Sequence, residues 1–170
     1  MKNKQGMSLI EVIFYTAIIA IVFILVVNSL SIVIKAFNQG RVSIKINNSA
    51  ETAMERMTRE IRFAYDVDDS SVLGSSPGHL VLNTYSTSSP EVTTLIEFYI
   101  DSGKLMIKEG DMTADQLTSS DLSVTNLIFR EIIASSISKA VKIEMTLQGS
   151  SGNYQKIENF YNTAILRKSY

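Results

Sequence analysis

A long apolar run near the N-terminus limits what this chain can fold into. Glu11 is the only charged side chain between Met7 and Ile34. A helix of these roughly 28 residues rises about 42 Å, which exceeds the bilayer's hydrocarbon thickness of about 30 Å. The run therefore predicts a membrane-spanning helix. Lys2 and Lys4 precede it without a balancing acid, so the positive-inside rule places the N-terminus in the cytoplasm and the remaining chain outside.

The order of residues around this run differs from that of an ordinary secretory signal. Such a signal carries its small-residue cleavage site after the apolar core, whereas here the small residue, Gly6, comes before it. Glu11 follows five residues later. A carboxylate inside a bilayer is costly and indicates a functional site by default. The alternative is that Glu11 lies at the membrane interface as an ordinary flanking residue.

The segment from Gly6 to Val12, GMSLIEV, resembles the type III signal of type IV pilins and of the pseudopilins of type II secretion and competence systems. The resemblance implies that a membrane-embedded prepilin peptidase cuts after Gly6 and methylates the new N-terminus, Met7. It also implies that the Glu11 carboxylate pairs with the N-terminal amine of a neighbouring subunit, which makes its burial tolerable. Asn28 stands where many major pilins carry a helix-kinking proline, so a kink there stays open.

Composition bears on the class of function. The 170 residues carry 16 basic and 17 acidic side chains, and this formal net charge of -1 gives no basic excess that would indicate nucleic-acid binding. The chain has no cysteine, which excludes disulfides, thiolate metal sites and Cys-His catalysis. No pair of carboxylates stands out for acid-base work, and His79 is expected at the surface. We therefore expect no catalytic residue, metal or cofactor.

After the apolar run the chain becomes amphipathic. Apolar residues recur at spacings of three and four and form one stripe of a helix: Ala50, Ala53, Met54, Met57, Ile61 and Ala64. Residues 41–46 alternate like a strand, but we expect helix through them. Asn48 and Glu51 match a capping box, so either one helix covers residues 8–65 or a second begins near Asn48. Gly40 is a weak helix former and a second position for a kink.

Residues 66–78 have loop composition, and beyond them the pattern becomes alternating. Strands are predicted at 79–85, 93–100, 104–108, 122–129, 139–147 and 154–166, with hairpins across 101–103 and 148–153. The aspartates of the loop, Asp66, Asp68 and Asp69, lack the ligand spacing of an EF-hand, which favours a solvated loop over a calcium site. The apolar stripe of the helix can cover one face of the strands, which predicts an α+β fold with a long N-terminal helix on an antiparallel sheet.

These patterns divide the chain into a leader peptide (1–6), a transmembrane and filament-core helix (7–36), an amphipathic helix packed on the sheet (37–65) and a C-terminal β-sheet domain (66–170). Residues 51–64 resemble the corresponding helix of J-type minor pseudopilins and related minor pilins, which favours a tip or initiation role.

The resemblance implies a non-enzymatic minor pilin or pseudopilin whose domain lies in the periplasm or outside the cell. Its implied partners are other pilin or pseudopilin subunits, prepilin peptidase, the inner-membrane assembly platform and membrane lipid. The alternative is a single-pass membrane-anchored binding module that does not polymerise. The residues do not choose between secretion, competence, motility and adhesion systems.

Overall fold

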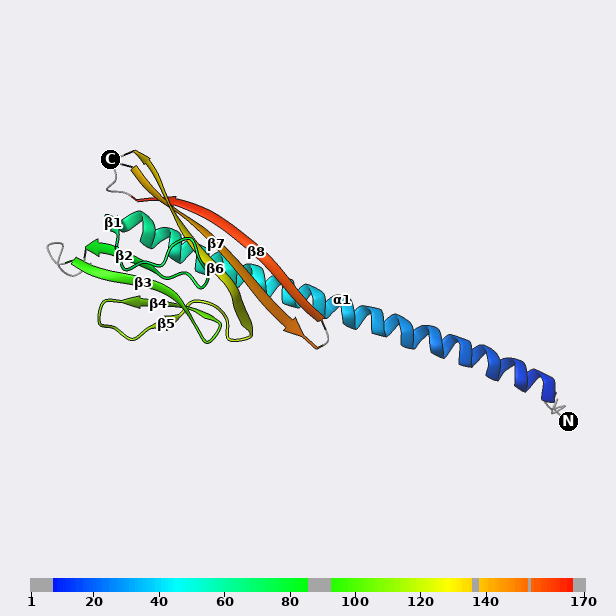
Figure 1. The fold of residues 1–170 in the computed structure, drawn as a ribbon. Helices are drawn as coiled ribbons and strands as arrows, with labels where there is room; N and C mark the ends of the chain where they lie inside the picture. Colours follow the sequence, from blue (N-terminus) through cyan, green and yellow to red (C-terminus); the bar gives the residue numbers. More distant parts are fainter. Residues whose placement is uncertain (1–7, 86–92, 136–137, 153, 167–170) are drawn as a thin grey trace. The chain divides into compact units, whose positions relative to one another are not determined.

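The computed structural model describes residues 8–85, 93–135, 138–152 and 154–166. The chain forms two compact units, Met1–Gly40 and Arg41–Tyr170. The elements in chain order (Figure 1) are α1 (Leu9–Phe63), β1 (Asp66–Val67), β2 (Leu80–Tyr85), β3 (Thr93–Asp101), β4 (Lys104–Glu109), β5 (Asp115–Gln116), β6 (Leu122–Ser135), β7 (Ser138–Ser151) and β8 (Tyr154–Ile165). The predicted α+β fold, a long helix packed on antiparallel strands, is confirmed.

A single helix, α1, contains every residue from Leu9 to Phe63. It passes through Asn28, Gly40 and Asn48, so the one-helix alternative is confirmed and no second helix begins at Asn48. The strand-like alternation of residues 41–46 does not decide the local structure, because packing selects a helical spacing. Val42 and Ile46, four residues apart, are buried, whereas Ile44 between them is 62% exposed.

The strands form two antiparallel sheets where the sequence predicted one. Strands β1 to β5 form a five-stranded sheet in chain order, and β6, β7 and β8 form a separate three-stranded sheet. Alternation assigns each side chain to a face but does not say which strands are neighbours, so the pattern did not reveal the division. The two-residue strands β1 and β5 were also not predicted, because elements this short carry no periodicity.

Both predicted hairpins are present, with longer strands than expected. Asp101 pairs with Lys104, and Ser102 and Gly103 between them have φ values of 49° and 74°. Two positive φ values in a two-residue loop define the turn whose twist matches the flanking strands. In the second hairpin β7 and β8 pair as far as Ser151 and Tyr154, so its loop is shorter than the predicted 148–153.

The core lies between α1 and both sheets. The predicted helical stripe is buried, with every member at most 8% exposed. Strand β7 contributes Val141, Ile143, Met145 and Leu147, all at most 1% exposed, as its alternation predicted. A register shift between Val124 and Asn126 changes the spacing in β6, so that Val124 and Leu127, three residues apart, both face the core.

The largest fully buried side chains come from all three layers: Ile46, Met57, Ile61, Leu80, Leu82, Phe98, Leu105, Leu127, Phe129, Ile143, Met145 and Leu147. They belong to one continuous apolar cluster, which begins at Val42. The second unit therefore has a core of its own.

Candidate functional site

The first candidate site is the apolar half of α1. Every residue from Ser8 to Phe37 is exposed. The exposed side chains include large ones such as Phe14, Phe23 and Leu25, which are 64%, 68% and 63% exposed. A soluble monomer rarely exposes an apolar surface of this extent. The helix is long and apolar enough to cross a membrane, and no residue of its most apolar 18-residue stretch is buried. It is therefore a candidate membrane span.

Glu11 lies in the first turn of this helix. The backbone N–H groups of Glu11 and Val12 both donate to the Ser8 carbonyl, at 3.0 and 3.2 Å, so helical hydrogen bonding starts there. A carboxylate in the first turn interacts favourably with the positive end of the helix dipole. The Tyr15 hydroxyl donates a hydrogen bond of 3.3 Å to Glu11 Oε1. The other two predicted site residues, Gly6 and Met7, lie outside the described residues.

The groups around Glu11 determine which hydrogen bonds its carboxylate can still accept. Its side chain is exposed on a helix surface that is mostly apolar and otherwise uncharged up to Lys35. An ionised carboxylate has roughly four acceptor positions, and Tyr15 occupies one of them. The remaining positions can accept hydrogen bonds from a cationic group of another molecule, in particular an ammonium.

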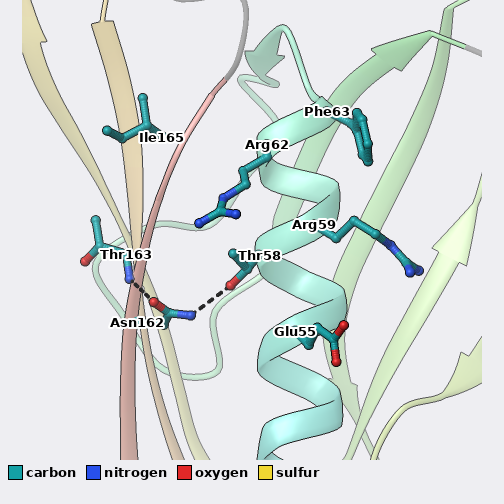
Figure 2. A pocket seen from close by; sticks show the side chains of 8 residues that line it. All are labelled: Glu55, Thr58, Arg59, Arg62, Phe63, Asn162, Thr163 and Ile165. Carbon is teal, nitrogen blue, oxygen red and sulfur yellow. Dashed lines mark hydrogen bonds between the residues drawn. The ribbon is translucent and has the colours of Figure 1, made fainter.

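A second candidate site, which sequence reasoning missed, is a groove between the last turns of α1 and strand β8. Its volume is about 920 Å³. Figure 2 shows the side chains that line it. Asn162 on β8 donates a hydrogen bond of 2.9 Å from its side-chain amide to the Thr58 hydroxyl on α1. Figure 2 shows the Arg62 side chain extending from α1 toward β8. The groove is lined by Glu55, Thr58, Arg59, Arg62, Phe63, Asn162, Thr163 and Ile165.

The arginines near this groove differ in their ion pairing. Glu60, 9% exposed, is in ion pairs with Arg56 Nε at 3.0 Å and Arg59 Nε at 3.3 Å. Arg62 has no ion-pair partner among the residues that the structure describes, so its guanidinium is available to a ligand. A basic residue in the last turn of a helix is common because it complements the dipole, so Arg62 alone gave no sequence signal.

A third cluster surrounds His79 on the five-stranded sheet. His79 Nε2 lies 3.1 Å from Glu97 Oε2, and Lys108 Nζ lies 3.5 Å from Glu97 Oε1. The His79 and Tyr99 rings meet edge to face, with centroids 5.6 Å apart. The depression here has a volume of about 330 Å³, and its lining contains no Ser, Thr or Cys nucleophile. The two-residue turn at 102–103 sets the β3–β4 register, which pairs Glu97 with Lys108. The predicted loop of 101–103 would have paired Glu97 with Ile107, so the sequence did not predict this contact.

The aspartates after α1 serve the local fold. Asp68 accepts hydrogen bonds from the Ser70 hydroxyl at 2.6 Å, the Ser70 backbone N–H at 3.0 Å and the Asn83 side-chain amide at 3.2 Å. These bonds, led by those from Ser70, hold the pKa of Asp68 below its ordinary value of 3.8. Asp66 forms an ion pair with Lys139. Within the described residues no three His, Cys, Asp or Glu side chains are placed to hold a metal ion.

The chain is thus an α+β protein with a candidate membrane span, a carboxylate at the start of that span, and a groove beside an edge strand. No protein-family model, curated protein or solved structure matches it. Its own residues therefore carry the functional proposal.

Proposed function

We propose that this chain is a minor pilin or pseudopilin, a non-enzymatic subunit of a type IV pilus-like filament. The observation that carries the proposal is Glu11, the one charge on the exposed apolar surface of α1 before Lys35. The resemblance of residues 6–12 to a prepilin signal supports the same function. So does the extent of the apolar surface, which offers both a membrane span and a face for packing against other helices.

In this proposal prepilin peptidase removes residues 1–6 by cutting after Gly6, and the amine of Met7 is methylated. The apolar half of α1 then holds the subunit in the cytoplasmic membrane, with the β-sheet unit on the outer side. On insertion scales a charged side chain at the centre of a span costs about 2.5–3.5 kcal/mol, and Glu11, close to the start of the span, costs less. Pairing with the Met7 ammonium of a neighbouring subunit offsets that cost, and it favours a staggered arrangement of helices in the filament.

The filament proposal accounts for Glu11 better than an anchored binding module does. A helix that only anchors a domain gains nothing from a charge so close to the start of its apolar segment, because the charge weakens insertion. In a filament the same charge selects the position of the next subunit.

The test is the intact mass of the full-length protein, expressed in membranes with and without a prepilin peptidase. We expect a peptidase-dependent loss of residues 1–6 together with the addition of one methyl group. The matched variant is Gly6→Val, which places a β-carbon where the peptidase must approach the backbone. We expect this variant to insert and to keep its full length. If the parent keeps its full-length mass with the peptidase present, the proposed processing is wrong. Equally efficient loss of residues 1–6 from Gly6→Val would contradict the requirement for glycine at the cleavage site.

A further inference from the structure

We propose that the free edge of β8 binds an extended, acidic segment of a partner protein, which adds a strand to the three-stranded sheet and places a carboxylate on Arg62. The inference concerns the second unit only. It holds whether the chain belongs to a filament or is an anchored module, so it can fail without affecting the proposed function.

The first observation is that β8 is an edge strand. Its 12 residues pair with β7 in continuous register, and no other described strand pairs with it. An edge strand presents a row of unpaired N–H and C=O groups, and proteins commonly block it with proline or a bulge. β8 contains neither, whereas the β6–β7 pairing has two register shifts. At the groove the Thr163 backbone N–H already donates to Asn162 Oδ1 at 2.8 Å, so an added strand displaces this bond or pairs with the other groups of the edge.

The second observation is that the groove of Figure 2 reaches around this edge. Successive residues of a strand face opposite sides of the sheet. Asn162 and the buried Ala164 lie on the face toward α1, where Asn162 bonds to Thr58. Thr163 and Ile165 are exposed on the opposite face of the strand. The groove is lined by Asn162, Thr163 and Ile165 together, so it passes around one edge of the strand. Pairing with β7 closes the other edge, so the groove opens on the free one.

The third observation is the chemistry of the lining. Phe63 and Ile165 are 54% and 55% exposed, so the groove offers apolar contacts. Arg62 is exposed and without an ion-pair partner in the described part of the chain, whereas Arg59 contacts Glu60 at 3.3 Å. A carboxylate can accept two parallel hydrogen bonds from the Arg62 guanidinium. Glu55, an exposed carboxylate, also lines the groove and disfavours an acidic side chain beside it. The lining therefore selects an extended apolar segment whose acidic side chain lies at Arg62.

These observations together favour an extended polypeptide over other occupants. Strand addition uses main-chain hydrogen bonds for affinity and side-chain contacts for specificity, which matches a free edge beside an apolar and cationic surface. A helix cannot pair its backbone with the edge, because its own hydrogen bonds use those groups. A small anion would contact Arg62 but leave the strand edge and the apolar residues unused.

The test is binding of a defined peptide to the full chain in micelles of an uncharged detergent. The probe is a fluorescently labelled eight-residue peptide of alternating valine and aspartate with blocked ends. The comparison peptides replace aspartate with lysine, or carry N-methyl groups on alternate backbone amides. We expect the acidic peptide to bind at least about tenfold more tightly than either, since one loses the ion pair and the other the strand hydrogen bonds.

The matched variants are Arg62→Ser and Arg41→Ser. Both remove one exposed arginine from α1, and the two positions lie roughly 32 Å apart along the helix at 1.5 Å per residue. Arg62→Ser should weaken binding of the acidic peptide about tenfold, the effect of one charge-assisted contact. Arg41→Ser should leave it unchanged. Amide hydrogen exchange should show new protection in β8 when the peptide is bound.

Three results would overturn the proposal. They are equal binding of the lysine and aspartate peptides, equal weakening by both arginine variants, and protection that falls outside β8. Self-association that Arg62→Ser abolishes, in a chain that binds no acidic peptide, would instead assign the groove to a second copy of this protein.

Discussion

The Tyr15 hydroxyl donates a hydrogen bond of 3.3 Å to Oε1 of Glu11, one helical turn earlier on the apolar surface of α1. The bond is long, and it serves one acceptor position of a carboxylate that has roughly four. In a bilayer no water satisfies the others. The geometry therefore gives Glu11 a neighbour within its own helix that orients the carboxylate but does not neutralise its charge.

Replacing Glu11 tests whether that charge recruits a neighbouring subunit. Glu11→Gln keeps the size of the side chain and removes the charge, so membrane insertion should remain intact or improve. Entry into the filament should fall, because the attraction for the Met7 ammonium is lost. Glu11→Asp should be intermediate, since the charge remains but is withdrawn by one methylene. The measurement is crosslinking of each variant into a filament or minor-subunit complex.

Two controls accompany this experiment. Each variant is checked for cleavage after Gly6, so that loss of processing is not read as loss of assembly. Tyr15→Phe removes the hydroxyl at 3.3 Å and keeps the charge of Glu11, so it should assemble nearly as the parent does. Unchanged incorporation of cleaved Glu11→Gln would make Glu11 a flanking residue and would favour the anchored module.

The second unit should be stable without the apolar segment. The buried apolar core begins at Val42, so deletion of residues 1–34 removes no core side chain. It also removes most of the exposed apolar surface of α1. We expect a soluble, monomeric fragment that unfolds cooperatively, as measured by size-exclusion chromatography and by thermal melting followed with circular dichroism. A fragment that aggregates or lacks a melting transition would contradict this expectation.

The placement of α1 on the sheets can be tested with one substitution at two positions. Ile61 is 0% exposed and Ile44 is 62% exposed on the same helix. Ile61→Asp puts an unpaired charge into the core and should destabilise residues 35–170 by about 4 kcal/mol or more, enough to unfold most small domains. Ile44→Asp has the same change in chemistry and should cost less than about 1 kcal/mol. Similar urea midpoints for both would mean that Ile61 does not face the sheets.

Sequence periodicity predicted which side chains are buried wherever the apolar residues of one element repeat with a single helical or strand spacing. The stripe from Ala50 to Ala64 and the alternation from Val141 to Leu147 are both buried as expected, because both belong to one continuous apolar core. Residues 41–46 show where periodicity alone does not determine the secondary structure. Three alternating apolar residues fit a strand, but only the contacts of Val42 and Ile46 with the rest of the core select the helix.

The groove could not be predicted from the sequence, because it depends on which strands are neighbours and on how β8 packs beside α1. Nothing in residues 154–166 says that β8 lies at the edge of a separate sheet, or that Asn162 reaches Thr58, 104 positions away. Glu11 is the opposite case. Its proposed role rests on the resemblance of residues 6–12 to a prepilin signal, a local pattern that does not depend on the tertiary structure, and the structure adds only the contact with Tyr15.

Gly149 on β7 allows α1 to approach the three-stranded sheet. A β-carbon at this position would lie 2.7 Å from Leu122 Cδ2 and 3.2 Å from Ile46 Cγ1, and both side chains are buried. Gly149→Ala should therefore destabilise residues 35–170 by about 1–3 kcal/mol through overpacking. Ser150→Ala, at the next and exposed position, should change the unfolding free energy little. Equal urea midpoints for the parent and Gly149→Ala would show that this contact is not tight.

The last prediction concerns acid. The Lys45 ammonium, which forms an ion pair with Asp121, holds the pKa of that carboxyl below its ordinary value of 3.8. The Lys142 hydrogen bond, followed by that of Arg130, lowers the pKa of Glu144 from its ordinary 4.5. A carboxyl whose pKa is lower in the folded state stabilises the fold above its unfolded pKa, and this contribution is lost as pH falls through the folded value.

The unfolding free energy of residues 35–170 should therefore decline as pH falls below about 4.5, the ordinary pKa of the glutamate carboxyl. Asp121→Asn should be less stable than the parent at pH 7, and the difference should shrink as acid protonates Asp121 in the parent. Added salt should also reduce it, because exposed charges are screened. Asp111→Asn, at an exposed carboxylate without an ion-pair partner in the described part of the chain, is the control for loss of one negative charge. Urea unfolding from pH 3 to pH 7 measures all three proteins, and a constant difference between Asp121→Asn and the parent over that range would rule out the contribution of the Lys45 pair.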